Sequence, residues 1–200
     1  MQTDMTVGKP MKMILDFTIP VFIGNVFQQF YNMADAIIVG KFVGTKGLAA
    51  VGSTGTIMFL IIGFLMGLTA GFTVLTSQKF GAGKMDEMRQ SVGNAALLSI
   101  IISVIMTAVS MVGMHPLLTL MHTPEDIFQD AYTYIMIICG GIFAQVLYNI
   151  LASILRALGN SKTPLYFLIL AALLNIVLDL TFIIVFHMGV AGAARATITA

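Results

Sequence analysis

The stretch PLYFLILAALLNIVLDLTFIIVFHM, residues 164–188, decides the fold class of this chain. It is long enough to cross a bilayer, because about 20 apolar residues in an α-helix span the hydrocarbon core. Asp179 is its only formally charged residue. A carboxylate near the middle of a membrane helix costs about 2.5–3.5 kcal/mol on insertion scales. Such a residue therefore usually faces a bundle interior or a wet cavity and handles an ion, a proton or a substrate.

The first hydrophobic segment repeats this arrangement of a carboxylate in apolar surroundings. Asp35 follows the amides Asn25, Gln28, Gln29 and Asn32 in a run that is otherwise largely apolar. Amides in a membrane helix commonly hydrogen-bond to neighbouring helices, and we expect Gln28 and Asn32 to support the carboxylate in this way. Two carboxylates inside a membrane bundle favour a transport function.

The composition places the whole chain in a membrane. Of its 200 residues, 58% are hydrophobic and 10% are charged, and the mean hydropathy is +0.96. Charged residues make up about a quarter of a soluble domain, so a soluble fold is excluded. The net charge of +1 gives no indication of nucleic-acid binding. Cys139 is the only cysteine and lies in an apolar run, so we expect it to pack as a small apolar side chain.

Breaks at clusters of charge, Gly and Pro predict a polytopic bundle of α-helices. Complete spans are expected near residues 14–39, 48–78, 91–113, 127–155 and 164–186, and a sixth begins at 190. The run from 14 to 39 is too long for a secretory signal and shows no cleavage pattern, so it is expected to be the retained first helix. Pro20 within it removes a backbone hydrogen bond and predicts a hinge. The sixth span stops at Ala200 without a cap, so we expect the native polypeptide to continue.

The basic residues predict the orientation in the membrane, because Lys and Arg gather in cytoplasmic loops. The loop at 114–126 contains neither, and we assign it to the outside. We therefore predict a multi-pass protein of the plasma membrane with a cytoplasmic N-terminus. The residues assigned to the cytoplasmic side are Lys9, Lys12, Lys79, Lys84, Arg89, Arg156 and Lys162, and those assigned to the outer side are Lys41, Lys46 and Arg195.

A candidate ion site combines the two carboxylates with nearby oxygens. Asn175 and Asp179 are four residues apart and so project from one face of a helix. If Asp35 meets them, two carboxylates, an amide oxygen and the Thr197 hydroxyl supply the hard oxygen ligands of a cation such as Na⁺. A proton suits the same group, because two carboxylates in close contact repel and one of them then takes up a proton within reach of cellular pH. The alternative is a structural role, in which each aspartate only hydrogen-bonds to a neighbouring helix.

Other motifs carry no chemistry in this interpretation. The stripe of Gly63, Gly67 and Gly71 is expected to let another helix approach closely. The spacing of His115 and His122 fits no metal motif. The Gly-rich segments KFGAGK and RALGNSK lack the spacing of a phosphate-binding loop, so we expect no nucleotide site and no ATP-driven pump. With a transport function favoured, we expect no enzyme activity and no cofactor beyond the coupling ion.

Several segments together resemble the multidrug and toxic compound extrusion (MATE) family. They are YNMADAIIVG at 31–40 with GLAAVG at 47–52, SQKFGAGK at 77–84, ILRALGNSKTP at 154–164, NIVLDLTFI at 175–183 and GVAGAARAT at 189–197. Their order and spacing follow the N-terminal lobe of those transporters over nearly the whole chain.

The resemblance implies twelve helices in two lobes around a central cavity that opens alternately to either side. It implies export of cationic or lipophilic drugs and metabolites in exchange for Na⁺ or H⁺, without ATP or nucleic acid. Asp35, Asn175, Asp179 and Thr197 match the family's ion-site positions, and Tyr134 matches a tyrosine that hydrogen-bonds to the cluster. Pro20 stands where some members bend the first helix.

Three other functions remain open from the sequence. A lipid-linked oligosaccharide flippase of the same superfamily has a similar lobe, but several Arg or Lys usually line its cavity. An aspartyl intramembrane protease also uses two membrane aspartates, although its YD and GxGD motifs are replaced here by MAD and VLD. A structural membrane subunit would tolerate asparagine at both aspartates.

Overall fold

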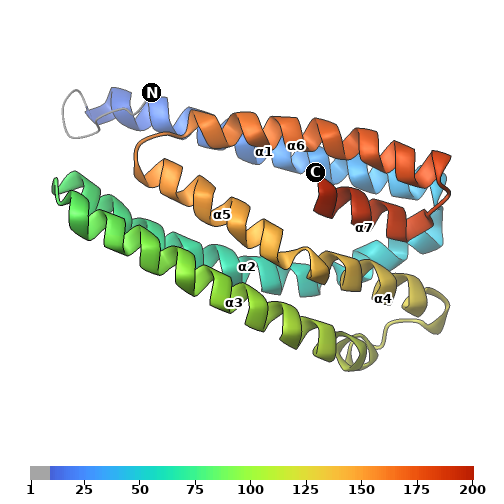
Figure 1. Cartoon of the computed structure of the whole chain (residues 1–200). Helices are drawn as coiled ribbons and strands as arrows, with labels where there is room; N and C mark the ends of the chain where they lie inside the picture. The colour runs from blue at the N-terminus through green and yellow to red at the C-terminus, as the bar shows by residue number, and fades with distance from the viewer. Residues whose placement is uncertain (1–9) are drawn as a thin grey trace.

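The computed structural model describes residues 10–200, and every regular element within this range is a helix (Figure 1). The predicted all-α class is therefore confirmed. Four helices or helix runs are long and apolar enough to cross a membrane, and a bent pair provides a fifth. The elements are α1 (Pro10–Phe42), α2 (Thr45–Gly81), α3 (Met85–Leu120), α4 (Glu125–Gly140), α5 (Ile142–Ala157), α6 (Lys162–Leu180), the π-helix η1 (Thr181–Val185) and α7 (Gly189–Thr199).

The segment predicted as one span at 127–155 is two helices in the structure. α4 and α5 meet at Gly141 with a bend of 48°. The Gly141 N–H donates to the carbonyl of Ile138 at 2.9 Å, three residues back, which tightens the last turn of α4. The first three helices extend beyond the predicted spans at both ends, and α3 continues through Pro116.

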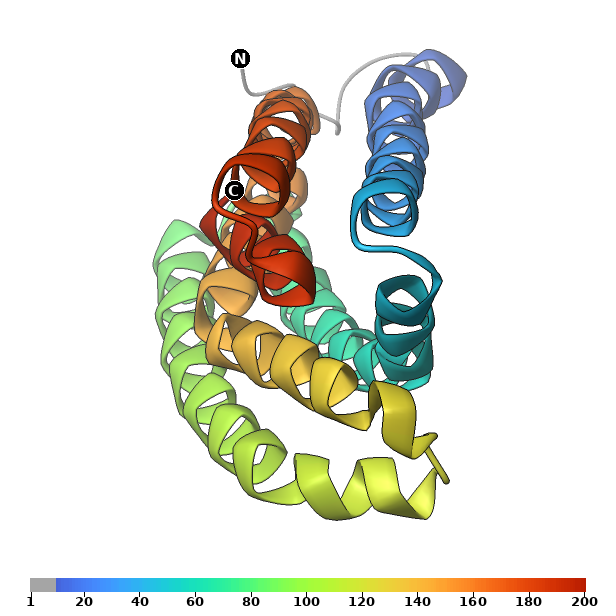
Figure 2. The same cartoon turned by 90° about the vertical axis from the view of Figure 1, so that its right-hand side faces the viewer.

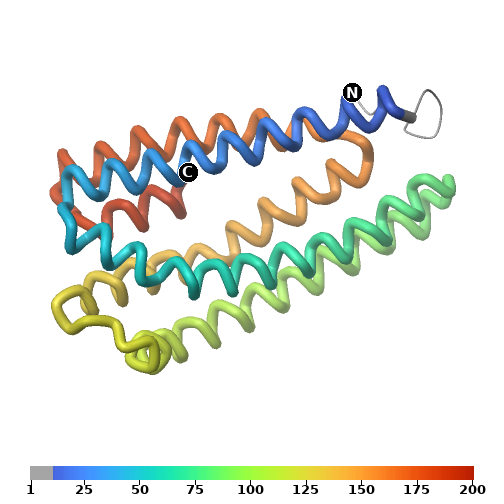
Figure 3. The backbone as a smooth tube through the Cα atoms, turned by 180° about the vertical axis from the view of Figure 1, so that it is seen from behind, coloured from blue at the N-terminus to red at the C-terminus, as the bar shows by residue number. Residues whose placement is uncertain are grey.

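The helices form two long pairs with shorter helices between them. α1 packs along α6, and α2 packs along α3, while α4 and α5 cross the space between the pairs (Figure 1). The short α7 contacts α4 and α6, and the chain ends midway along the bundle (Figures 1 and 3). Seen from one end, α1 lies apart from the ends of α3 and α4, so α6 and α2 are its main neighbours (Figure 2).

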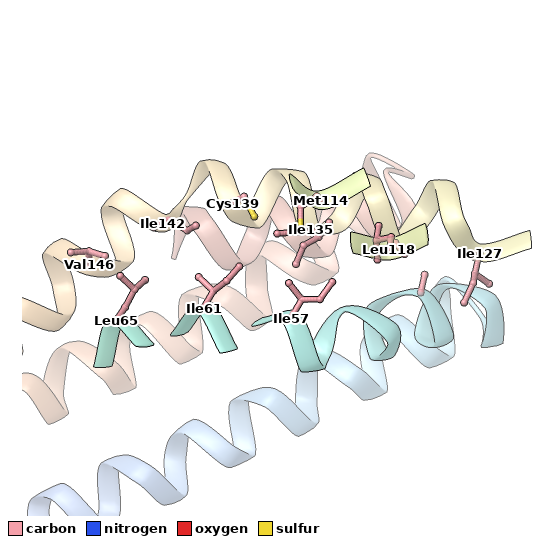
Figure 4. Packing of buried hydrophobic residues seen from close by; sticks show 12 residues of the cluster. Ile57, Ile61, Leu65, Met114, Leu118, Ile127, Ile135, Cys139, Ile142 and Val146 are labelled. Carbon is pink, nitrogen blue, oxygen red and sulfur yellow. The ribbon is translucent and has the colours of Figure 1, made fainter. Parts of the chain in front are cut away.

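Two apolar clusters hold the bundle together. The larger lies where α2 and α3 pack on α4 and α5, with Ile57, Ile61 and Leu65 of α2 pointing at the facing helices (Figure 4). Cys139 is buried in this cluster, which confirms its predicted packing role. The smaller cluster joins α1, α4, η1 and α7 through Ile38, Val39, Tyr134, Ile138, Ile183, Val190, Ala193 and Ala194.

The outer surface of the bundle is apolar, as expected for a protein surrounded by lipid. Val112, Phe59 and Leu120 are 82%, 76% and 74% exposed. Exposed apolar area of this extent marks a membrane or protein interface in a folded protein.

The glycine stripe does not pack against a helix within residues 10–200, so this prediction was wrong for the described chain. A Cβ built on Gly63, Gly67 or Gly71 meets no atom within 4 Å. The reason is helical geometry, because Ile61 and Leu65 face the core and a shift of two residues turns a side chain by about 200° around the axis. The stripe therefore lies on the face of α2 opposite to the core.

Candidate functional site

Asp179 and Asn175 are the most deeply buried polar residues of α6. Asp179 is 0% exposed and Asn175 is 1% exposed. With its amide oriented to satisfy both neighbours, Asn175 donates through Nδ2 to Oδ2 of Asp179 at 2.9 Å. The four-residue spacing predicted from sequence produces this contact, because residues i and i+4 lie one above the other on a helix.

Asp35 of α1 reaches the same place because α1 packs along α6. Its carboxyl lies within hydrogen-bonding reach of the Asp179 carboxyl. Oδ1 of Asp35 and Oδ1 of Asp179 are buried, and neither has a hydrogen-bond partner among residues 10–200. A buried polar atom without a partner costs about 1–3 kcal/mol, and more when it is charged, so a proton or a cation between the carboxyls would relieve this cost.

α7 closes the cluster through Thr197. Its backbone N–H donates to Oδ1 of Asn175 at 3.3 Å, and its hydroxyl donates to the carbonyl of Ala193 at 3.0 Å. The Tyr31 side chain neighbours the Thr197 side chain. We call Asp35, Asn175, Asp179, Thr197 and Tyr31 the carboxylate cluster.

Tyr31 was missed in the sequence analysis, although a signal was present. It precedes Asp35 by four residues, so both project from the same face of α1. A tyrosine in a membrane helix is commonly interpreted as an interfacial anchor, so Tyr31 was not connected with Asp35.

Three predicted supporting residues lie outside the cluster. Tyr134 is buried near both aspartates, but within the described part of the chain its hydroxyl makes no hydrogen bond, and its ring packs in the smaller apolar cluster. Asn32 and Gln28 are exposed. The structure thus gives Tyr31, not Tyr134, the contact with Thr197.

Gln28 lines a separate polar crevice of about 80 Å³ between α1, α5 and α6. Pro20 and Gln28 of α1 face Pro164 and Leu168 of α6 across it. Leu168 precedes Asn175 by seven residues and Asp179 by eleven, which is about two and three helical turns, so the crevice and the carboxylate cluster lie along the same face of α6. α1 runs unbroken through Pro20, whose role as a hinge stays a prediction. The crevice is also lined by Asn25, Tyr148, Asn149, Arg156 and Ser161.

The donor set fits a hard cation or a proton better than a transition metal. Within residues 10–200, no three His, Cys, Asp or Glu side chains gather as a metal site. Two carboxylates and an amide oxygen are the oxygen ligands that Na⁺-like and other hard cations accept. The same two carboxyls can share one proton.

Comparisons with known proteins agree with this architecture. The MatE family profile matches residues 20–181. The chain is 35% identical over 195 residues to the probable multidrug resistance protein YpnP of Bacillus subtilis (strain 168), which covers 98% of the chain and 44% of YpnP. It is 25% identical over 193 residues to an FAD transporter of Shewanella oneidensis, which covers 94% of the chain and 42% of that protein.

A solved structure of a MOP superfamily transporter from Pyrococcus furiosus superposes on the chain with a TM-score of 0.91 at 32% identity. The superposition covers 96% of the chain and 42% of the transporter. The chain thus spans less than half the length of these relatives and corresponds to their N-terminal lobe. Since the family profile covers most of the chain and the relatives are transporters rather than enzymes, this protein belongs to the MATE family.

Proposed function

We propose that the polypeptide containing this chain is a secondary antiporter that exports cationic or lipophilic drugs and metabolites in exchange for Na⁺ or H⁺. The chain supplies the first lobe and the ion site, and a second lobe completes the central cavity. One observation carries the proposal: two buried carboxyls from different helices lie within reach of each other, and one oxygen of each has no partner in residues 10–200.

The coupling follows from the energetics of that pair. An ion or proton that neutralises Asp35 and Asp179 stabilises the conformation in which α1 and α6 hold them together, and its release favours the other conformation. For an uncharged cargo, moving one ion down a potential of ~100 mV releases about 2.3 kcal/mol, which sustains roughly a fifty-fold gradient of the exported compound. For a monovalent cationic cargo exchanged one for one, no net charge moves, and the concentration gradient of the ion drives export.

The polar crevice between α1, α5 and α6 supports a path for cargo or ion that leads towards the cluster. It joins amides with apolar side chains such as Met66 and Leu168, a mixture suited to amphipathic compounds. One relative of this lobe is named for multidrug resistance and another for FAD transport, so the cargo is the part of the proposal that depends most on the second lobe.

The flippase alternative finds less support in the crevice. Arg156 is the only Lys or Arg that lines it within the described chain, whereas a phosphate-bearing lipid calls for several. We also propose the plasma membrane as the location, with the N-terminus in the cytoplasm. Lys9 lies outside the described residues, so this orientation rests on the remaining basic residues.

The test is efflux of a fluorescent cationic drug by the complete polypeptide in proteoliposomes, with Na⁺ and pH gradients imposed separately. We expect efflux to follow one of the two gradients and to be abolished when that gradient is collapsed by an ionophore. Equal efflux with neither gradient, or efflux that requires ATP, would refute the antiport proposal.

A further inference from the structure

Two neighbouring glycines at the break between α4 and α5 have opposite surroundings. A Cβ on Gly140 would meet no atom within 4 Å, whereas a Cβ on Gly141 would lie 2.5 Å from Cγ2 and 2.9 Å from Cβ of Ile198. The Gly141 backbone has φ −87° and ψ −4°, which any residue adopts. Glycine is therefore required at 141 for space and not for its conformation.

Ile198 follows Thr197 in α7 and packs against Gly141. This contact holds the last turn of α7 at the break between α4 and α5. The earlier turns are held elsewhere, because Gly192 packs on Phe182 and Val190 packs near Gly47. α7 has only eleven residues, and the turn with Thr197 is the one that reaches the α4–α5 break. Ile198 is 39% exposed, and the part of its side chain at Cβ and Cγ2 lies against Gly141, so this contact bears directly on the position of the Thr197 backbone.

The contacts continue from Thr197 to the carboxylates. Its N–H holds the Asn175 carbonyl at 3.3 Å, and this orients the Asn175 amide to donate to Asp179 at 2.9 Å. An N–H···O contact of 3.3 Å is already at the long end of the normal range, so a shift of α7 by about 1 Å breaks it. Asn175 is then free to turn away from Asp179.

We propose that Gly141 and Ile198 form a positioning pair for the carboxylate cluster, which links the bend between α4 and α5 to the geometry of the Asp35–Asp179 site. A change in the bend moves the seat of Ile198 and thereby Thr197, Asn175 and Asp179 in turn. The role in transport rests on the proposed antiport, while the positioning role concerns the cluster itself and is measured without transport.

The experiment compares Gly141→Ala with Gly140→Ala as its matched control in the purified complete polypeptide. A Cβ at 141 must push Ile198 by about 1 Å to reach the ordinary contact range of 3.4–4 Å, whereas a Cβ at 140 displaces nothing. The readout is the rate at which dicyclohexylcarbodiimide modifies Asp35 and Asp179, measured by mass spectrometry across pH and Na⁺ concentration. This reagent attacks protonated carboxyls in apolar surroundings, so its rate reports on the cluster and not on drug movement.

We expect Gly141→Ala to change, by about ten-fold, the H⁺ concentration at which modification of the two aspartates is half-maximal or the Na⁺ concentration that halves it. Loss of a residue that orients an ion ligand has an effect of this size. Gly140→Ala should stay within about two-fold of the wild type, as for an exposed substitution. Adding Ile198→Gly to Gly141→Ala should restore protection towards the wild-type value, because glycine at 198 removes both Cγ2 and Cβ, the two atoms that the new methyl group would meet.

Two results would overturn the positioning role: protection in Gly141→Ala that matches Gly140→Ala, or a double variant as impaired as Gly141→Ala alone. If Gly141→Ala does not fold, Ile198→Ala alone tests the proposal. Loss of the Ile198 contact with Gly141 must then change the ion concentration that half-protects the aspartates, while the thermal midpoint shows that the variant is folded. A wild type that exports no drug would refute the antiport proposal, yet the protection measurements would still decide the role of Gly141.

Discussion

Asp179 combines complete burial with a carboxyl oxygen that has no partner in residues 10–200, which is difficult to explain by stability alone. We predict that Asp179→Asn lowers ion-coupled efflux by at least about 10–100-fold, the loss typical of altered ion-site shells. Asparagine has the same shape and no charge, so the variant should insert and fold. The measurement is gradient-driven efflux in proteoliposomes at matched protein amounts.

Asp16→Asn is the matched control for that variant. Asp16 lies on the same helix as Asp35 but is exposed, so its loss should leave coupling intact. Coupled efflux that survives in Asp179→Asn would favour the structural-subunit interpretation, in which the aspartates only hold helices together.

Tyr31 and Tyr134 differ in one contact, and this difference is testable. Neither hydroxyl makes a hydrogen bond of normal length in the described chain, but Tyr31 neighbours Thr197, whereas Tyr134 packs in the smaller apolar cluster. Tyr31→Phe should raise the half-saturating concentration of the coupling ion by roughly two- to ten-fold, since one net hydrogen bond contributes about 0.5–1.5 kcal/mol. Tyr134→Phe should leave this concentration unchanged. A larger effect of Tyr134→Phe would restore the tyrosine assignment made from sequence.

The sequence indicated most of the side chains that form the carboxylate cluster, but not the hydrogen bonds that some of them make. Asp35 and Asp179 could be identified because each is a charge in a long apolar run, and Asn175 because it lies one turn from Asp179. The contact of Thr197 through its backbone could not be predicted, since a main-chain donor leaves no trace in the residue types. Its hydroxyl, which the sequence suggested as an ion ligand, bonds to Ala193 in the structure.

At the scale of helices, small residues have different uses that the sequence does not distinguish. A Cβ added to Gly192 of α7 would lie 3.2 Å from the Phe182 backbone, whereas one added to Gly67 of α2 would meet no atom within 4 Å in the described chain. We predict that Gly67→Ala leaves the thermal midpoint unchanged or raises it, because Ala favours a helix by up to about 1 kcal/mol over Gly. Gly192→Ala should lower it, because overpacking against a backbone costs about 1–3 kcal/mol.

Thermal unfolding of the complete polypeptide in detergent, followed by intrinsic tyrosine fluorescence or circular dichroism, measures both variants. If Gly67→Ala destabilises the protein as much as Gly192→Ala does, then the Gly63–Gly67–Gly71 face packs against a part of the polypeptide outside this chain.

The break between α4 and α5 shows why helix boundaries were only partly predictable. Hydropathy is continuous from 127 to 155, and consecutive glycines are tolerated in membrane helices, so one span was the natural interpretation. At the bend, Gly141 lies against Ile198, a residue 57 positions away, and the sequence does not show which distant residue lies there. Long-range packing of this kind decides the position of a break more than local composition does.

Across the whole molecule, the basic residues lie at the two ends of the helix bundle, in different settings. The end with the N-terminal part of α1, the α2–α3 connection and the α5–α6 connection holds Lys12, Lys84 and Arg156 (Figure 1). At the opposite end, Lys46 pairs with Asp126 at 3.4 Å between α2 and α4, while the loop before α4 contains no Lys or Arg. This asymmetry predicts that the first end is cytoplasmic.

Single cysteines placed at the two ends test this orientation. Cys139 is the only cysteine of this chain and is buried, so Cys139→Ala, with any cysteine of the second lobe also replaced, provides the background for Ala82→Cys and Glu125→Cys, both at exposed positions. A maleimide that cannot cross membranes should label Glu125→Cys in intact cells and Ala82→Cys only after permeabilisation. The matched pair controls for reactivity, because each cysteine is fully labelled in detergent. The reverse pattern would place the basic end outside, and the path of cargo and ion through the polar crevice would then have to run in the opposite direction.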